Sequence, residues 1–173
     1  MDRETLRKAQ QPLKERYRNE PETALVTLRA EGALGEGVTC SVQTGRALVE
    51  AGLHPASGGP GMSVCSGDML LQALVACAGV TLNSVATSME IPIRRGSVHA
   101  EGDLDFRGTM GVSKETPVGF TAIRLRFNLD VSAPPEKLER LIELTQRYCV
   151  VYQTLLEAPR IDVTVSSAAD FQP

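Results

Sequence analysis

The stretch from Ser66 to Met89, SGDMLLQALVACAGVTLNSVATSM, carries one charged side chain and one cysteine, Cys77. A serine or aspartate ahead of an apolar run is a helix-start signal, because its side-chain oxygen accepts hydrogen bonds from free backbone N–H groups. The opposite face holds only small or uncharged residues, so the pattern predicts a central helix that is buried on nearly all sides. Apolar side chains repeat at helical spacing at Leu70, Leu71, Leu74, Val75, Ala78 and Leu82.

This predicted helix is long enough to cross a bilayer, which needs roughly 20 apolar residues. It also contains Asp68, Gln72, Asn83 and several hydroxyl groups, and the sequence around it is charged and amphipathic. We therefore expect a buried core helix that carries a thiol, and no contact with a membrane.

The composition indicates one soluble globular domain. The chain has 173 residues, 42% hydrophobic and 23% charged, which suffices for a single domain with a proper core. The net charge of -3 and the scarcity of aromatic side chains argue against nucleic-acid binding. The first twenty residues are charged and lack the apolar core of a signal peptide. We therefore expect a cytoplasmic protein.

Four cysteines, Cys40, Cys65, Cys77 and Cys149, occur without any CxxC spacing. In a cytoplasmic chain we expect them to be reduced rather than paired in structural disulfides. With only two histidines, a zinc site would need ligands gathered from distant segments, so we expect no metal and no cofactor. Each cysteine is therefore either a small buried hydrophobe or a reactive thiol.

The segment before the central helix predicts a short helix and then strands. Residues 4–20 are compatible with a surface helix, whereas residues 24–32, ALVTLRAEG, alternate as a half-buried strand does. After a glycine-rich turn, residues 38–45, VTCSVQTG, are expected to return as the second strand of a hairpin. Residues 46–53, RALVEAGL, then predict a third strand, and residues 54–61, HPASGGPG, a loop.

Two alternating stretches follow the central helix. Residues 120–132, FTAIRLRFNLDVS, form the clearer strand, with Arg124 and Arg126 on its expected wet face. Residues 110–120 predict the hairpin connection that joins it to the preceding strand. That preceding strand spans residues 95–108 and has the apolar members Val98, Ala100, Leu104 and Phe106.

The last third of the chain predicts two helices and a strand. Pro135 occupies the first turn of one helix, residues 148–159 indicate another, and residues 161–167, IDVTVSS, read as a final short strand. This order predicts an α+β domain with antiparallel sheet and segregated helices. We assign residues 1–22 to an N-terminal helical extension and residues 23–173 to a single domain.

The helix at Cys77 resembles the central-helix motif of the OsmC/Ohr family (osmotically inducible protein C and organic hydroperoxide resistance protein). In GDMLLQALVACAGVTLNSVA an acidic residue opens the helix, followed by apolar and small residues and then Ala-Cys. RYCVVYQTL is similar to the family's second cysteine ahead of a late helix. The resemblance covers roughly residues 23–165. It implies an OsmC-like intertwined homodimer, with the two cysteines close together in an active site at the dimer interface.

The resemblance further implies a thiol peroxidase for oxidative-stress defence. Cys77 then matches the peroxidatic cysteine, Cys149 the resolving cysteine, and Asp68 the acidic residue near the helix start. The implied substrate is an organic hydroperoxide or hydrogen peroxide. The implied reductant is a small thiol or a lipoyl- or thioredoxin-type protein. Cys40 and Cys65 match no position of the family.

The residues themselves leave two functions open. A peroxide is attacked by the thiolate, and burial raises the pKa of a thiol such as Cys77, so a cation or a hydrogen-bond donor must oppose that shift. The organic-hydroperoxide branch of the family uses an arginine in the early hairpin, where Arg46 is only the nearest here. Val150 stands where the family commonly has proline. These departures favour the alternative, a non-enzymatic redox-sensing or small-ligand-binding dimer.

Overall fold

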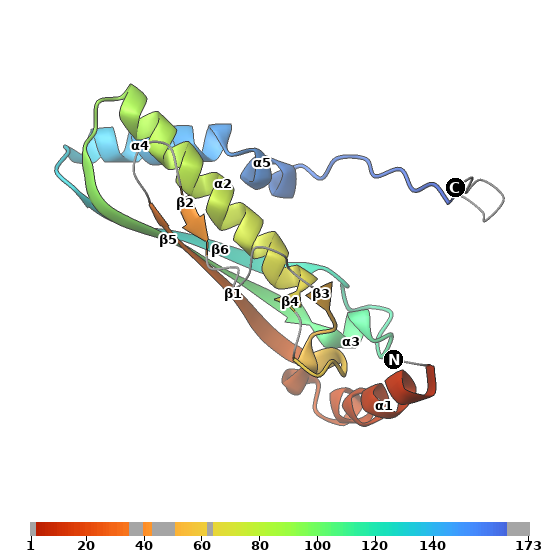
Figure 1. Cartoon of the computed structure of the whole chain (residues 1–173). Helices are drawn as coiled ribbons and strands as arrows, with labels where there is room; N and C mark the ends of the chain where they lie inside the picture. The colour runs from red at the N-terminus through yellow and green to blue at the C-terminus, as the bar shows by residue number, and fades with distance from the viewer. Residues whose placement is uncertain (1–2, 35–39, 43–50, 62–63, 166–173) are drawn as a thin grey trace, which may run out of the picture.

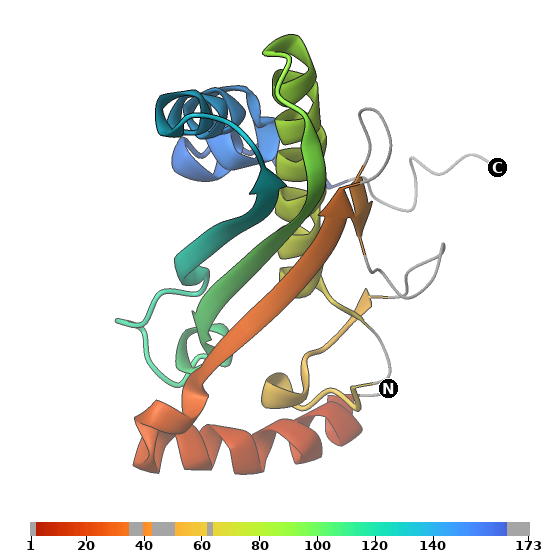
Figure 2. The same cartoon turned by 90° about the vertical axis from the view of Figure 1, so that its left-hand side faces the viewer.

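The fold is organised by one long helix that crosses one face of an antiparallel sheet (Figure 1). The structure, a computed structural model, describes residues 3–34, 40–42, 51–61 and 64–165. Helix α2, Ser66–Ser88, is the central helix, and α4, Pro135–Tyr148, and α5, Val150–Leu156, lie beside it on the same side of the sheet (Figure 2). The predicted α+β architecture with an antiparallel sheet and a long central helix is confirmed.

The sheet has four strands in the order β2-β1-β5-β6. Neighbouring strands are antiparallel throughout, and the register pairs Val98 with Phe127 and Ala100 with Leu125. Val98 and Ala100 are buried beneath α2, because alternate side chains of a strand point to the same face. The strands are β1, Leu25–Leu34; β2, Cys40–Val42; β5, Ile93–Asp105; and β6, Phe120–Val131.

Helix α2 begins and ends close to where the sequence predicts. Its N-cap residue is Cys65, and Asp68 occupies the first turn. At its other end Glu90 adopts a left-handed conformation with a φ of 53°, and the N–H of Ile91 donates to the carbonyl of Ala86 at 2.9 Å. This is a common way for a helix to stop, and Pro92 then prevents its continuation.

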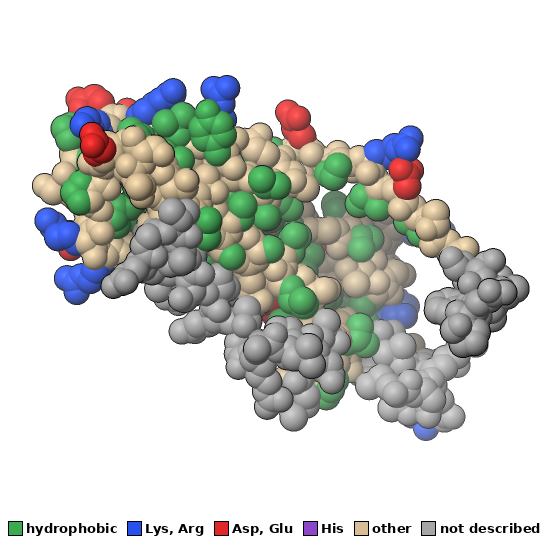
Figure 3. All heavy atoms as spheres, turned by 45° about the horizontal axis from the view of Figure 1, so that its top comes forward, with side chains coloured by type: hydrophobic (Ala, Val, Ile, Leu, Met, Phe, Trp, Pro, Cys, Tyr) green, Lys and Arg blue, Asp and Glu red, His purple; other side chains and the backbone are tan. Residues whose placement is uncertain are grey.

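Within one chain, α2 is buried on one side only. Met69, Leu70 and Val80 are each 37–38% exposed. The prediction of burial on nearly all sides is therefore wrong for the single chain, since the described sheet, α4 and α5 cover one side of the helix while these three side chains stay exposed on the other. Figure 3 shows hydrophobic side chains across the face that carries these helices. The fully covered positions, at most 1% exposed, are Leu71, Leu74, Val75, Ala78 and Leu82.

By length and composition, α2 is the one helix among the described residues that would be able to cross a membrane. The core helix of a globular domain meets the same criteria of length and composition. Here the helix packs on the sheet through its leucines and valine, and it contacts both α4 and α5. This packing is what the sequence predicts for a core helix.

The outer face of the sheet is polar, as the sequence predicts. Arg124 of β6 bonds to Asp103 at 2.6 Å and to Glu101 at 3.3 Å, both on the neighbouring strand β5. One expected member of β5 differs: Phe106 opens the short helix α3, Phe106–Thr109. The strand ends there because the side chain of Asp105 accepts a hydrogen bond from the backbone N–H of Arg107 and caps the turn.

The early strands differ in part from the prediction. The hairpin of β1 and β2 is confirmed, with Leu34 opposite Cys40. The expected third strand mostly lies outside the described residues. Its described end, β3 at Ala51–Gly52, pairs in parallel with β4 at Val64–Cys65 and forms a separate two-stranded sheet. It therefore does not extend the hairpin at this point.

The predicted C-terminal strand is absent from the described residues 161–165. Ile161, Val163 and Val165 are 80%, 83% and 92% exposed, and the segment runs away from the sheet (Figure 1). Alternation of apolar and polar residues indicates a strand only where a sheet edge is available to pair with. Among the described strands, none pairs with this segment.

The N-terminal extension forms helix α1, Arg3–Asn19, which crosses one end of the sheet (Figure 2). Its Tyr17 is fully buried and donates a hydrogen bond from its hydroxyl to the carbonyl of Ala56. Tyr17 also belongs to a small cluster with Phe106 and Met110. The helix is thereby attached to the loop that leads into β4 and α2.

The burial of α2 predicts how strongly its leucines contribute to stability. Leu82→Ala removes a side chain that is 0% exposed, so we expect a loss of about 2–5 kcal/mol in the free energy of unfolding. The matched change Leu156→Ala, at a position 63% exposed, should cost about 0.5 kcal/mol or less. Urea unfolding followed by circular dichroism measures both, and equal losses would contradict the described packing.

Candidate active site

The structure brings the two predicted cysteines together. Cys77 lies in the middle of α2, and Cys149 lies between α4 and α5 as the C-cap of the first and the N-cap of the second. Cys149 is buried in the main core cluster, and Cys77 packs against that cluster. The two thiols share a hydrogen bond although the residues are 72 positions (149 − 77) apart in the sequence. Only the packing of α4 and α5 against α2 makes this pair possible.

The turn at Cys149 is held by the backbone of both helices. The N–H of Cys149 donates to the carbonyl of Thr145 at 2.9 Å, and the carbonyl of Cys149 accepts from the N–H of Gln153 at 2.9 Å. Leu141 and Thr145, both at most 1% exposed, anchor α4 in the core. This arrangement places the first N–H groups of α5 next to α2.

Hydrogen-bond donors surround the sulfur of Cys77. Burial by itself raises the pKa of this thiol, but four donors outweigh the burial, so the pKa of Cys77 lies below the ordinary thiol value. These donors are the backbone N–H groups of Val151 and Val150, the thiol of Cys149 and the hydroxyl of Thr81. Together these donors stabilise the thiolate of Cys77, which is the role that we expected of a cation or a hydrogen-bond donor.

The pKa of Cys149 shifts in the opposite direction. Its pKa is raised to about 11, chiefly by burial and further by the neighbouring sulfur of Cys77, through hydrogen bonding and charge. Backbone N–H groups of Tyr152 and Val151 oppose this only in part. Of the two thiols, Cys77 therefore loses its proton first, and Cys149 keeps its proton at neutral pH.

Asp68 is not beside the thiol pair. It lies in the first turn of α2, nine positions (77 − 68) before Cys77, which corresponds to about 14 Å along the helix axis. Burial raises the pKa of Asp68, and the nearby His54 opposes that rise. The structure thus places Asp68 with the loop that carries His54. Its role as a site residue stays a prediction.

Of the remaining cysteines, Cys65 ends β4 and caps α2, twelve positions (77 − 65) before Cys77, or about 18 Å along the helix axis. It is therefore not part of the pair. The side chains of Cys40 and Arg46 lie outside the described part of the structure. Within that part, the groups that shift the pKa of Cys77 include no arginine. The described residues also contain no cluster of three or more His, Cys, Asp or Glu side chains that is able to hold a metal ion.

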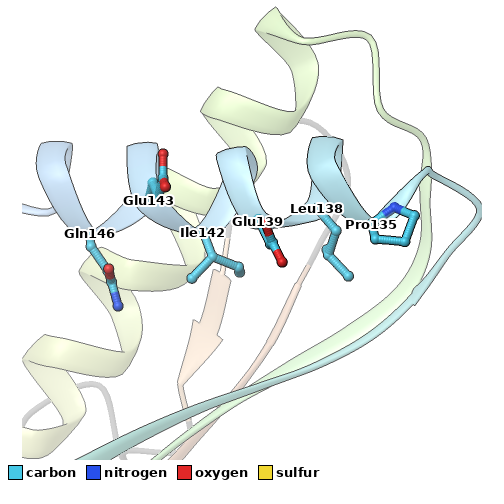
Figure 4. A pocket seen from close by; sticks show the side chains of 6 residues that line it. All are labelled: Pro135, Leu138, Glu139, Ile142, Glu143 and Gln146. Atoms are coloured by element: carbon cyan, nitrogen blue, oxygen red, sulfur yellow. The ribbon is translucent and has the colours of Figure 1, made fainter.

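A cavity of about 440 Å³, with mainly hydrophobic residues along its lining, lies near the thiol pair, although neither cysteine lines it. Leu74 and Tyr152 both line the cavity. Leu74 lies one turn before Cys77 on α2, and Tyr152 lies three residues after Cys149. Gln146 borders this cavity and also a groove of about 470 Å³ along α4. Figure 4 shows Leu138 and Ile142 pointing from α4 toward the sheet at this groove. The other residues that line the cavity are Phe120, Thr121, Ala122, Ile123, Leu125, Leu155 and Leu156.

The comparisons with known proteins agree with this architecture. The model of the OsmC-like protein family matches residues 59–164, a span that includes α2 and both cysteines of the pair. The chain belongs to the OsmC-like family. The resemblance drawn from the sequence is thereby confirmed. No curated protein matches the sequence.

Two solved structures share the OsmC-like fold. An OsmC-like hydroperoxide resistance protein from Jannaschia sp. CCS1 matches with a TM-score of 0.59 and 17% identity, over 84% of this chain and 95% of that chain. An OsmC-like protein from Mycoplasma pneumoniae matches with a TM-score of 0.54 and 17% identity, over 78% of this chain and 86% of that chain. At this identity the likeness shows the fold alone.

The donors around Cys77 are the part of the site that sequence reasoning missed. Backbone N–H groups carry no sequence signal, so those of Val150 and Val151 are visible only once α5 is placed against α2. Thr81 has a weak signal, because residues four apart lie on the same side of a helix and Thr81 follows Cys77 by four.

The opposite pKa shifts predict two separate titrations. We expect Cys77 to be alkylated by iodoacetamide with a pH midpoint below that of an ordinary thiol, and Cys149 with a midpoint near pH 11. Peptide mass spectrometry after alkylation over a range of pH measures each cysteine separately. Coincident midpoints, or the reverse order, would contradict the described hydrogen bonds.

Proposed function

We propose that this protein is a thiol-dependent peroxidase that reduces organic hydroperoxides and protects the cell against oxidative stress. The observation that carries the proposal is the pairing of Cys77, whose thiolate is stabilised by four donors, with Cys149, which keeps its proton. A thiolate is the species that attacks a peroxide. Cys77 is then the peroxidatic cysteine and Cys149 the resolving cysteine.

The chemistry follows from that distribution of charge. The thiolate of Cys77 attacks the terminal oxygen of ROOH and breaks the O–O bond, which gives a sulfenic acid on Cys77 and the alkoxide RO⁻. The alkoxide takes a proton, for which the thiol of Cys149 is the nearest source within the pair, and leaves as ROH. The sulfur of Cys149, now a thiolate, then attacks the sulfenic sulfur, so a disulfide forms and hydroxide leaves, which takes a proton from solvent to become water.

The cycle needs two thiol groups, from one dithiol or from two small thiols, to reduce that disulfide by exchange. We propose a small thiol or a lipoyl- or thioredoxin-type protein, in keeping with a cytoplasmic location. The apolar cavity beside Leu74 and Tyr152 supports an organic substituent on the peroxide, because an apolar group loses contact with water when it enters such a cavity. Hydrogen peroxide would leave the cavity unused.

We further propose that the protein forms an intertwined homodimer. Two unpartnered apolar surfaces support a second copy of the chain as the cover. One is the open side of α2 with Met69, Leu70 and Val80, and the other is the alternating segment with Ile161 and Val163. Exposed apolar groups of this size mark interaction surfaces.

A second function shares the same site. A redox sensor or ligand-binding dimer would use the Cys77–Cys149 pair or the cavity without turnover. Mass spectrometry after mild peroxide treatment separates the two functions. A reversible disulfide between these cysteines without catalytic consumption of peroxide would support sensing. A chain that stays unmodified would support ligand binding.

Peroxidase activity is tested with cumene hydroperoxide and a dithiol such as dithiothreitol or dihydrolipoamide. We expect Cys77→Ser to reduce peroxide consumption to the rate of the mixture without protein, because the nucleophile is lost. In the absence of the dithiol, Cys149→Ser should consume about one peroxide per chain and leave a sulfenic acid that dimedone traps. Peroxide loss is followed by a ferrous xylenol orange assay.

Cys65→Ser is the matched control, since Cys65 lies about 18 Å along the helix from Cys77. It should turn over at the rate of the unmodified protein. Unchanged turnover in Cys77→Ser would remove this cysteine from the mechanism. Loss of turnover in Cys65→Ser would place the reactive thiol elsewhere.

The homodimer is tested by light scattering coupled to size exclusion. We expect the full chain to elute as a dimer. Val163→Asp should shift the population toward the monomer, because a charge on an interface strand is not compensated. Thr164→Asp, on the opposite side of the same segment, is the matched control and should remain dimeric. A full chain that is monomeric at all concentrations would overturn the proposed assembly.

A further inference from the structure

A glycine in the sheet lets an aromatic ring lie on the backbone of the neighbouring strand. Gly102 of β5 is buried and stands opposite Ile123 of β6. A Cβ atom at Gly102 would lie only 2.5 Å from Cε1 and 2.6 Å from Cδ1 of the Phe120 ring. Real Cβ atoms essentially never come so close to another heavy atom. The ring therefore occupies the space that any larger residue at position 102 would need.

A β-bulge turns Phe120 toward the core. The register pairs Ala122 with Asp103 and Phe120 with Leu104, so Thr121 is an extra residue on β6. Its hydroxyl donates a hydrogen bond to the backbone carbonyl of Asp103 at 3.1 Å. The extra residue reverses the alternation of the strand. Phe120 therefore lies on the face of the sheet that carries the helices, where it packs against the main core cluster.

The ring of Phe120 forms part of the wall of the cavity of about 440 Å³ near the thiol pair. Tyr152 of α5 lines the same cavity, so aromatic side chains from a strand and from a helix both border it. Pockets for small ligands have volumes of about 300–1,000 Å³ and a mainly apolar lining. The cavity meets both criteria.

Leu74 connects this cavity with the thiol pair. It lines the cavity and lies three positions before Cys77 on α2. Residues three apart are neighbours on the surface of a helix. Phe120 and Cys77 also pack against the same core cluster, to which Leu74 belongs. A ligand in the cavity would therefore lie beside the turn of α2 that carries the sulfur.

We propose that the cavity binds an aryl group and that Phe120, seated on Gly102, is the residue that selects it. In the proposed peroxidase the aryl group is the substituent of the hydroperoxide, and this assignment rests on the proposed function. Aromatic rings in contact gain stability beyond the apolar area that they bury. A linear alkyl chain lacks this contribution, and it loses more rotational freedom on binding than a rigid ring does.

Cumene hydroperoxide and tert-butyl hydroperoxide form a matched pair of substrates, because the second has a methyl group in place of the phenyl ring. We expect the unmodified protein to have the higher kcat/KM for cumene hydroperoxide. Phe120→Ala should lower this preference by about tenfold, as the loss of an apolar contact in a pocket does. The kcat/KM for tert-butyl hydroperoxide should change little. Peroxide loss in the presence of dithiothreitol measures both rates.

Circular dichroism verifies that each variant is folded. If Phe120→Ala does not fold, Phe120→Leu keeps an apolar side chain without the ring and should also lower the preference. An unchanged preference in either folded variant would overturn the inference.

Gly102→Ala tests the seat of the ring. The three heavy atoms nearest to the added methyl group all belong to Phe120, so the methyl group displaces the ring and should lower the preference for cumene hydroperoxide. In the double variant with Phe120→Ala the ring is gone, and Gly102→Ala should have no further effect on the preference. Losses that simply multiply in the double variant would contradict the proposed seat.

Gly119→Ala is the matched control. Gly119 precedes Phe120 in the sequence, but a Cβ atom there would meet nothing within 4 Å. The preference for cumene hydroperoxide should therefore stay that of the unmodified protein. A loss in Gly119→Ala equal to that in Gly102→Ala would show that the ring contact is not the cause.

Binding without peroxide separates this inference from the proposed function. Cumyl alcohol, the product of cumene hydroperoxide, is titrated into the full chain and followed by NMR, with tert-butanol as the ligand without a ring. We expect Phe120→Ala to weaken the binding of cumyl alcohol by about tenfold. If this holds but no peroxide is consumed, the peroxidase function fails and the aryl site stands. If peroxide is consumed but Phe120→Ala binds cumyl alcohol as the unmodified protein does, the aryl site fails and the peroxidase stands.

Discussion

The burial of one side of α2 against the sheet is the constraint on which the rest of the structure depends. Leu71, Leu74 and Val75 are at most 1% exposed, and they pack over strands whose side chains alternate between the core and water. The apolar area that this removes from water is the main favourable term in folding. Because the helix has a fixed place on the sheet, the position of Cys77 is fixed as well. The elements that follow in the sequence, α4 and α5, pack against the same helix and complete its surroundings.

The reactivity of the thiol pair depends on which of the two sulfur atoms has its negative charge stabilised. Burial alone raises the pKa of both thiols, and neither would be reactive at neutral pH. The donors are distributed unevenly, however, since Val150, Val151 and Thr81 direct theirs toward Cys77. One cysteine is thereby prepared as a nucleophile while Cys149 remains a thiol. The proposed peroxidase chemistry needs this division of roles, because one sulfur must attack as a thiolate and the other must supply a proton to the alkoxide that leaves.

Two surfaces of the chain expose apolar side chains. The side of α2 that faces away from the sheet carries exposed apolar side chains, and so does the segment from Ile161 to Val165. From the sequence we expected both to be buried, the first as a fully covered helix and the second as a strand. Each of these interpretations assumes a neighbour that a single chain does not supply. The polar outer face of the sheet differs, because Arg124 forms its ion pairs with Asp103 and Glu101 on the adjacent strand of the same chain.

The sequence by itself determined the class of fold, the bounds of α2 to within one residue, the hairpin of β5 and β6, and membership of the OsmC-like family. These follow from local patterns, because helical and alternating spacing record which face of an element is apolar. It also named Cys77 and Cys149, through the motifs around them. Only the tertiary structure decided that the two thiols meet, that Asp68 lies apart from them, and that Thr81 and two backbone N–H groups take the place of a cation. The physical reason is that backbone donors are the same in every residue, so their position relative to a sulfur 72 residues away depends on packing and not on composition.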